Sequence, residues 1–226
     1  MNKIASVIKM HRTDKWTWLL IPWMIMLSSF TVNFTISFFV DEPMITGGLS
    51  SIFIYVFITG IIILAQTFPF ALGMSVSRTD YFWGTSVMIL LSSIVSAALL
   101  LLLRLIETWT NAWGSDLHFF KLPYLSDGPL LIQFFVQLIL LLFMYYFGFL
   151  IASTYRRTGR IGLFLIAGIL LVLFTVLSFM ANYLNWYPAI FDWMVNQSAL
   201  DYALWMLPLV LLFSASSYLL LRRATI

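Results

Sequence analysis

The chain has 226 residues, of which 62% are hydrophobic and only 9% are charged. Soluble domains are about 45–50% apolar and about 25% charged, so this composition predicts a membrane protein and excludes an ordinary soluble domain. The net charge of +3 is too small to favour nucleic acid as a partner, and the lack of cysteine excludes disulfides, thiol catalysis and cysteine-based metal sites.

Residues 1–15 are charged, and they precede an apolar run that is too long for the core of a signal peptide. Four residues in this segment fall at helical spacing and form a stripe: Ile4, Val7, Ile8 and His11. We expect either an amphipathic helix on the anionic inner leaflet or a basic tail that only sets the topology. In the first case the residues at the membrane surface are Lys3, Lys9, Arg12, Lys15 and Trp16.

Six apolar segments are long enough to cross a bilayer as helices, which takes about 20 residues each. They cover residues 16–40, 50–73, 85–106, 130–153, 161–184 and 203–221. Backbone groups in lipid must be hydrogen-bonded internally, and these runs do not alternate as the strands of a β-barrel would, so helices are expected. Residues 1–226 are therefore predicted to form one all-α transmembrane domain.

Ten of the twelve Lys and Arg residues fall at the two termini or in the loops after the second and fourth spans. The positive-inside rule therefore predicts that both termini are cytoplasmic. The two longer outer loops are rich in aromatic residues, which predicts either an interfacial belt or short helices on or in the outer leaflet. In the second of these loops Pro188 would precede an apolar stripe formed by Ile190, Phe191, Met194 and Val195.

The spans contain almost no ionisable side chain, which disfavours a proton-driven transporter because such proteins use membrane-embedded relays. Arg104 is the exception, and either pairing with Glu107 or snorkelling accounts for it. The chain contains neither a phosphate-binding loop nor an H-E-x-x-H motif, so we predict no metal site, no catalytic residue and no cofactor of its own. Gln66, Gln133 and Gln137 either bond to neighbouring helices or line a conduit.

The segment between the second and third spans contains Ser77-Arg78-Thr79-Asp80, which has the spacing of a capping box with Asp in its last position. This pattern predicts a short helix that begins at Arg78, and Gly84 would permit a bend before the third span. An aromatic face would follow at the cytoplasmic boundary. The alternative is an ordinary interfacial loop whose single arginine obeys the positive-inside rule.

The whole chain resembles the permease subunit of a bacterial ABC transporter of the ABC-2 exporter type. The likeness rests on the size, the basic N-terminal segment, the six spans and, most specifically, the stretch FALGMSVSRTDYFWGT. In that family the corresponding stretch is a cytoplasmic coupling helix that docks on the ATPase. The resemblance implies this role for Arg78, Thr79, Asp80 and Tyr81, with Ser77 and Gly84 shaping the helix. It also implies an outer re-entrant segment between the fifth and sixth spans.

The second inner loop is a weaker docking candidate through Arg156, Arg157 and Arg160, which are also explained as topology charges beside lipid phosphates. The resemblance further implies that Mg-ATP binds to separate ATP-binding cassette subunits, and that a second permease copy or a paralogue completes the transporter in the bacterial cytoplasmic membrane. The expected function is ATP-driven export of an amphiphilic peptide, lipid-like or drug-like cargo. The alternatives are a non-transporting membrane sensor or immunity protein, and a channel or facilitator.

Overall fold

The computed structural model describes residues 3–40, 42–123 and 128–224. Within this part of the chain, seven α-helices account for most of the structure: α1 (Lys3–Thr13), α2 (Ile21–Ser37), α3 (Ser50–Gly73), α4 (Arg78–Trp109), α5 (Leu130–Tyr183), α6 (Trp186–Val195) and α7 (Ala199–Arg222). The shorter elements are a π-helical turn η1 (Trp16–Leu20), two 3-10 turns η2 (Gly47–Leu49) and η3 (Ala112–Gly114), and strands β1 (Met44–Ile45) and β2 (Leu117–His118).

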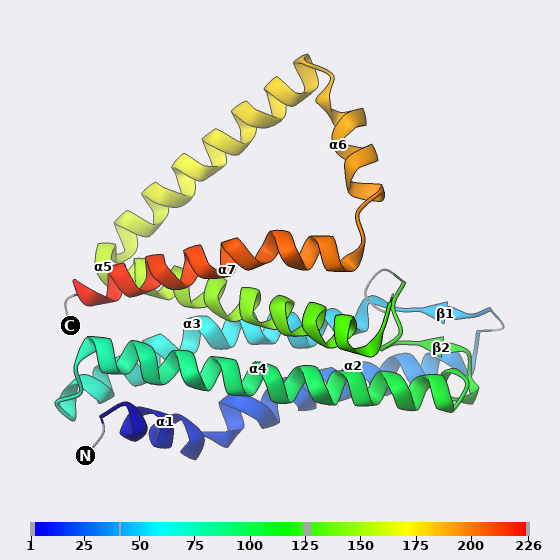
Figure 1. Ribbon diagram of the computed structural model, residues 1–226, viewed down its shortest axis with the longest axis horizontal. Coiled ribbons are helices and arrows are strands. Elements are labelled where there is room, and N and C mark those ends of the chain that lie inside the picture. The colour runs from blue at the N-terminus through cyan, green and yellow to red at the C-terminus, as the bar shows by residue number, and fades with distance from the viewer. Residues whose placement is uncertain (1–2, 41, 124–127, 225–226) are drawn as a thin grey trace.

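The long helices lie side by side in a bundle, with both termini at one end and the two strands at the other (Figure 1). Among the described residues, five helical stretches are long and apolar enough to cross a membrane: Trp16–Ser37, Gly47–Gly73, Arg78–Trp109, Leu130–Tyr183 and Ala199–Arg222. The predicted all-α fold is therefore confirmed, and these apolar helices are candidate spans of a multi-pass membrane protein. We call the end that holds both termini the basic end, because α1, the start of α4 and the end of α7 bring their Lys and Arg residues there.

Helix α5 differs from the prediction, because it contains both the fourth and the fifth expected spans. Its 54 residues would extend about 80 Å at about 1.5 Å per residue, far more than a hydrocarbon core of about 30 Å. The helical conformation breaks at Gly159, where φ is 70° and ψ is −173°, a combination that glycine adopts without steric cost. Figure 1 shows α5 turning away from the bundle at the basic end. Beyond the break, from Ile161 to Tyr183, only Ala181 is buried.

The first half of α5 packs against α3 through a close crossing of two glycines. A Cβ atom on Gly60 would meet the carbonyl oxygen of Tyr145 and would lie 3.3 Å from the Cα of Gly148. A Cβ on Gly148 would in turn meet the carbonyl oxygen of Phe57. Small residues at such crossings let membrane helices approach until their backbones touch, which increases van der Waals contact. The bundle is therefore held at its centre by backbone-to-backbone packing of α3 and α5.

The two loops that were expected on the outer side fold in different ways. The loop after α4 contains η3 and β2, and β2 pairs in parallel with β1 at Met44–Leu117 and Ile45–His118. The loop after α5 contains α6, so a short helix is present as the second alternative predicts, but it begins at Trp186, two residues before Pro188. Helix α6 has no buried residue, and it connects the far end of α5 with the start of α7 (Figure 1).

Candidate functional site at the basic end of the bundle

The start of α4 is capped as the sequence predicts. The hydroxyl of Ser77 accepts a hydrogen bond from the backbone N–H of Asp80 at 3.0 Å, and it donates to Oδ2 of Asp80 at 2.6 Å. The preceding turn passes through Ser75, whose φ is 60°. Asp80 also lies in the first turn, where a carboxylate interacts favourably with the positive end of the helix dipole. The capping motif therefore fixes where α4 begins.

A separate coupling helix is not present, and this part of the prediction is wrong. Helix α4 continues from Arg78 to Trp109 without a break, so the expected coupling helix is the first two turns of a 32-residue helix. Gly84 does not bend the chain. It is needed for contact instead, because a Cβ there would lie 2.6 Å from the Cβ of Val7 and 3.2 Å from the carbonyl oxygen of Ile4. Helix α1 occupies the space that a side chain on Gly84 would need.

Tyr81 does not face outward, which corrects its expected role in a docking surface. Its side chain is fully buried, and its hydroxyl shares a hydrogen bond of 2.7 Å with that of Thr67 on α3. Neighbouring Phe82 is buried as well. Both residues belong to a cluster of side chains from α1, α3, α4, α5 and α7, with one residue from the turn before α4, which we call the inner cluster. It consists of Val7, Leu64, Phe68, Ala71, Val76, Tyr81, Phe82, Phe149, Ala152 and Leu221.

The residues of the motif that reach the surface are therefore fewer than expected. Thr79 is exposed, and Arg78 and Asp80 are half-buried. Ser77 is exposed but is committed to the cap. A partner that binds at this end of α4 would contact Arg78, Thr79 and Asp80, whereas Tyr81 would act only through the packing behind them.

Helix α1 is present, as the first of the two alternatives predicts, and two residues of its stripe contact protein. Val7 and His11 are buried against α4, and Nε2 of His11 lies 3.0 Å from the hydroxyl oxygen of Thr85. At the start of α1, the ammonium of Lys3 donates to the carbonyl oxygen of Ser75 at 2.9 Å, which ties α1 to the turn before α4. The other expected membrane-surface residues remain exposed: Lys9, Arg12, Lys15 and Trp16.

His11 is the buried titratable group of this junction. Removal of the ring from water lowers the pKa of His11 from 6.5 to about 4, and the nearby Asp14 partly opposes that effect. The neutral ring packs edge-on against Trp18, with 5.2 Å between ring centroids, and lies 6.1 Å from the ring of Tyr81. The imidazole thus joins α1, η1 and α4 as an uncharged group at neutral pH.

The second inner loop is not a loop but the last turns of the first half of α5. Nη2 of Arg156 donates to the carbonyl oxygen of Ala65 on α3 at 2.9 Å. Through this hydrogen bond the Arg156 side chain links α5 to α3 at the basic end. Arg157 and Arg160 are exposed beside the break at Gly159, where phosphates or a partner could reach them.

The three glutamines that were considered for a conduit do not come together. Gln66 is exposed on the half of α3 nearer the basic end. Gln133 and Gln137 are buried near the start of α5, at the opposite end of the bundle. Nε2 of Gln133 donates to the carbonyl oxygen of Gly128 at 2.7 Å, so it supports the entry to α5. This placement offers no shared path for the three side chains.

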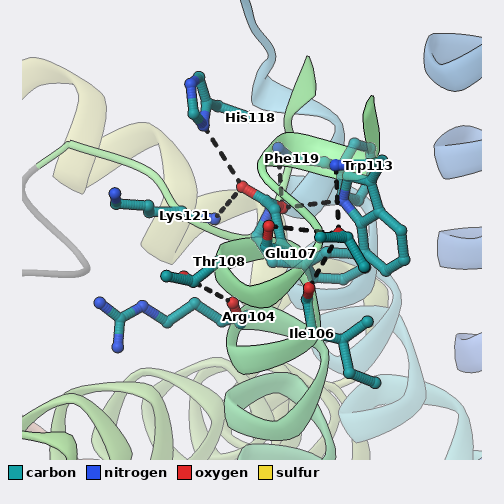
Figure 2. A network of polar contacts seen from close by, with 10 residues as sticks. Arg104, Ile106, Glu107, Thr108, Trp113, His118, Phe119 and Lys121 are labelled. Atoms are coloured by element: carbon teal, nitrogen blue, oxygen red, sulfur yellow. Dashed lines mark hydrogen bonds and ion pairs between the residues drawn. The ribbon is translucent and has the colours of Figure 1, made fainter. Parts of the chain in front are cut away.

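Sequence reasoning missed an extensive polar network among the described residues, which Figure 2 shows around Glu107 at the end of α4 opposite the basic end. This buried carboxylate accepts from the backbone N–H of Phe120 at 2.7 Å, of Lys121 at 3.1 Å and of Phe119 at 3.2 Å. The indole N–H of Trp113 donates to it at 3.3 Å, and Nδ1 of His118 lies 3.6 Å away. One side chain thus satisfies donors from a loop that lies up to 14 residues further along the chain.

The Glu107 network supports a strained segment. Residues 111–114 all have positive φ, between 51° and 72°, which costs about 1 kcal/mol or more for each residue other than glycine. Hydrogen bonds to a charged acceptor contribute about 1.5–3 kcal/mol each and can offset that strain. We therefore interpret Glu107 as a structural anchor of the loop after α4. Within the described residues no group of three or more His, Asp or Glu side chains is placed to hold a metal.

Comparisons of the chain with protein-family models, with curated proteins and with solved structures found no match. Function must therefore be inferred from the geometry of the site and from the chemistry of its residues. The basic end offers one specific arrangement, in which the capped and partly exposed start of α4 is packed into the inner cluster.

Proposed function

We propose that this chain is the membrane-spanning permease subunit of an ATP-driven exporter and that it carries an amphiphilic peptide, lipid-like or drug-like cargo. The observation that carries the proposal is the packing of the start of α4. Arg78, Thr79 and Asp80 are accessible, while Tyr81 and Phe82, directly behind them, contact residues of four other helices through the inner cluster. A displacement of the helix start would therefore reach α1, α3, α5 and α7 together, because close-packed interiors transmit strain.

In this proposal the chain crosses the membrane six times. Helix α5 contributes two crossings separated at Gly159, both termini are cytoplasmic, and α6 is the outer re-entrant segment. The length of α5 and the separation of its two halves support this topology, as does the gathering of basic residues at one end of the bundle. ATP hydrolysis, with its Mg-ATP, belongs to separate ATP-binding cassette subunits. A second permease copy or a paralogue completes the transporter in the bacterial cytoplasmic membrane.

The first test is co-purification. The full chain, expressed at its native level with an affinity tag, should recover an ATP-binding subunit in mild detergent. Recovery of the chain without any ATPase would refute the proposal. A conductance measured in liposomes that contain this chain alone would instead favour a channel or facilitator.

The second test addresses the docking surface. Arg78→Glu should leave membrane insertion intact but should weaken ATPase recovery and abolish export-linked activity, because it reverses the charge at the exposed start of α4. Arg223→Glu is the matched control, since Arg223 is an exposed arginine at the same end of the bundle but follows α7. Equal loss of recovery in both variants would indicate a general electrostatic effect and would contradict docking through α4.

A further inference from the structure

An apolar pocket of about 450 Å³ lies between α5, α6 and α7, at the end of the bundle opposite the two termini. This volume falls in the range of about 300–1,000 Å³ that is typical of ligand sites. The apolar lining includes Val136 and Leu140 of α5, Phe191 and Val195 of α6, and Ala203 and Met206 of α7. Figure 1 shows that α6 connects the far end of α5 with the start of α7.

Water is a poor occupant of this pocket. A buried water needs two to four polar partners, and cavities without such partners stay dry. Gln197 and Tyr202 supply the polar side chains among the described lining residues. The hydroxyl of Tyr202 already donates to the carbonyl oxygen of Met194 at 2.7 Å. The chemistry of the walls therefore selects an apolar occupant.

The pocket opens onto surface that lipid would cover. Phe191 and Val195 line it and are nevertheless 67% and 65% exposed. The second half of α5, which leads into α6, is also apolar and exposed, with Ile161 at 77% and Phe174 at 72%. Both α5 and α7 are apolar and long enough to cross a membrane. The apolar molecules in direct contact with the opening are therefore the acyl chains of the surrounding bilayer.

We propose that this pocket binds an acyl chain of a membrane phospholipid, with α6 as its lateral wall. Occupation restores van der Waals contacts that the walls would lack around an empty space. Only the apolar acyl chain moves from the bilayer into the pocket, so the headgroup can remain at the membrane surface. The inference does not rest on the function proposed above, because a phospholipid can fill the pocket whether or not an ATPase binds at the other end.

The test uses the full chain in vesicles of phosphatidylethanolamine and phosphatidylglycerol that contain a trace of phospholipid with a diazirine on one acyl chain. After irradiation, labelled residues are located by mass spectrometry. Met206 lines the pocket and is half-buried, whereas Leu211 on the same helix is 62% exposed. We expect Met206 to be labelled at least as strongly as Leu211, although it has less exposed surface. Labelling of Met206 no higher than its exposure predicts would overturn the proposal.

A pocket-filling variant provides the second measurement. In Ala203→Phe the ring occupies the pocket, so labelling of Met206 should fall about fivefold while labelling of Leu211 is unchanged. The matched control is Leu212→Phe, which adds an aromatic ring on the exposed side of the same helix and should change neither site. If Ala203→Phe does not fold, Ala199→Leu fills the same pocket from a half-buried position.

Two results would refute the proposal at this stage. One is unchanged labelling of Met206 in the folded pocket-filling variants. The other is labelling of Met206 by a diazirine fatty acid but not by the phospholipid, which would refute the phospholipid as the occupant. The vesicles contain no ATPase, so these outcomes are independent of the co-purification test.

Discussion

The contact between α1 and α4 can be tested at Gly84, where the space for a side chain is already filled. In Gly84→Ala the new Cβ would lie 2.6 Å from the Cβ of Val7 and 2.7 Å from its Cγ1. Real Cβ atoms do not approach carbon atoms so closely, and the branched Val7 side chain is stiff, so α1 must move. Overpacking of this kind costs about 1–3 kcal/mol.

The higher helix propensity of alanine opposes this steric cost. A substitution at a second glycine measures the propensity effect by itself, so that it can be subtracted. Alanine favours a helix over glycine by up to about 1 kcal/mol. Gly168 lies inside the second half of α5, and a Cβ there meets nothing within 4 Å. Gly168→Ala therefore reports the propensity gain alone, and the difference between the two variants isolates the steric cost of about 1–3 kcal/mol. For a chain of this size that corresponds to about 2–12 °C in midpoint temperature.

Thermal unfolding in detergent is the first assay, and limited trypsin digestion is the second. Displacement of α1 from α4 should accelerate cleavage after Lys9 and Arg12, which are exposed basic residues on α1. We expect Gly84→Ala to unfold at a lower temperature and to be cut faster than Gly168→Ala. Equal midpoints and equal cleavage rates would refute the packing of Val7 against Gly84.

Three further outcomes are expected. Gly148→Ala should destabilise the protein by about 1–3 kcal/mol relative to Gly168→Ala in the same unfolding assay, because its Cβ meets the α3 backbone; a smaller loss would contradict the close crossing. Glu107→Ala should cost about 3–5 kcal/mol by leaving buried N–H groups without an acceptor. Glu107→Gln keeps one acceptor oxygen and should cost less, and equal losses would argue against the anchor role. As the pH is lowered from 6.5 to 4, the free energy of unfolding should fall by about 1.4 kcal/mol per pH unit. The reason is that His11 in the unfolded chain takes up a proton near pH 6.5, whereas His11 in the folded protein, with a pKa of about 4, does not. His11→Gln should remove this pH dependence from unfolding midpoints measured across that range. A pH dependence that persists in the variant would show that other titratable groups cause it.

The helices were predictable because their signals are local. Each expected span is a continuous apolar run, and each such run is helical in the structure. The cap at Ser77 also depends only on residues three positions apart, so the start of α4 could be predicted to the residue. What the pattern missed was the continuity of α4 beyond Gly84. Glycine permits a bend, but a bend occurs only where the neighbouring helices favour it.

The site was less predictable because its contacts join residues far apart in the chain. Tyr81 follows a polar motif and borders Phe82 and Trp83, so its position in the sequence gives no sign of which aromatic ring is buried. Its burial depends on Thr67 and Phe68 of α3. Glu107 presents the same difficulty, since its hydrogen-bond donors are backbone groups, and backbone N–H groups are the same in every residue except proline.

The stripe on α1 shows why a membrane protein can mislead an interpretation based on amphipathic pattern. In a soluble protein an apolar stripe indicates contact with protein, but beside a bilayer the same stripe fits lipid equally well. Two residues distinguish contact with protein from contact with lipid. His11 lies on the stripe, and a polar ring facing lipid would lack the partner that Thr85 provides. Gly84 offers a gap in α4 into which Val7 fits. A polar residue on an apolar stripe, together with a glycine in a neighbouring span, therefore favours packing against protein over contact with lipid.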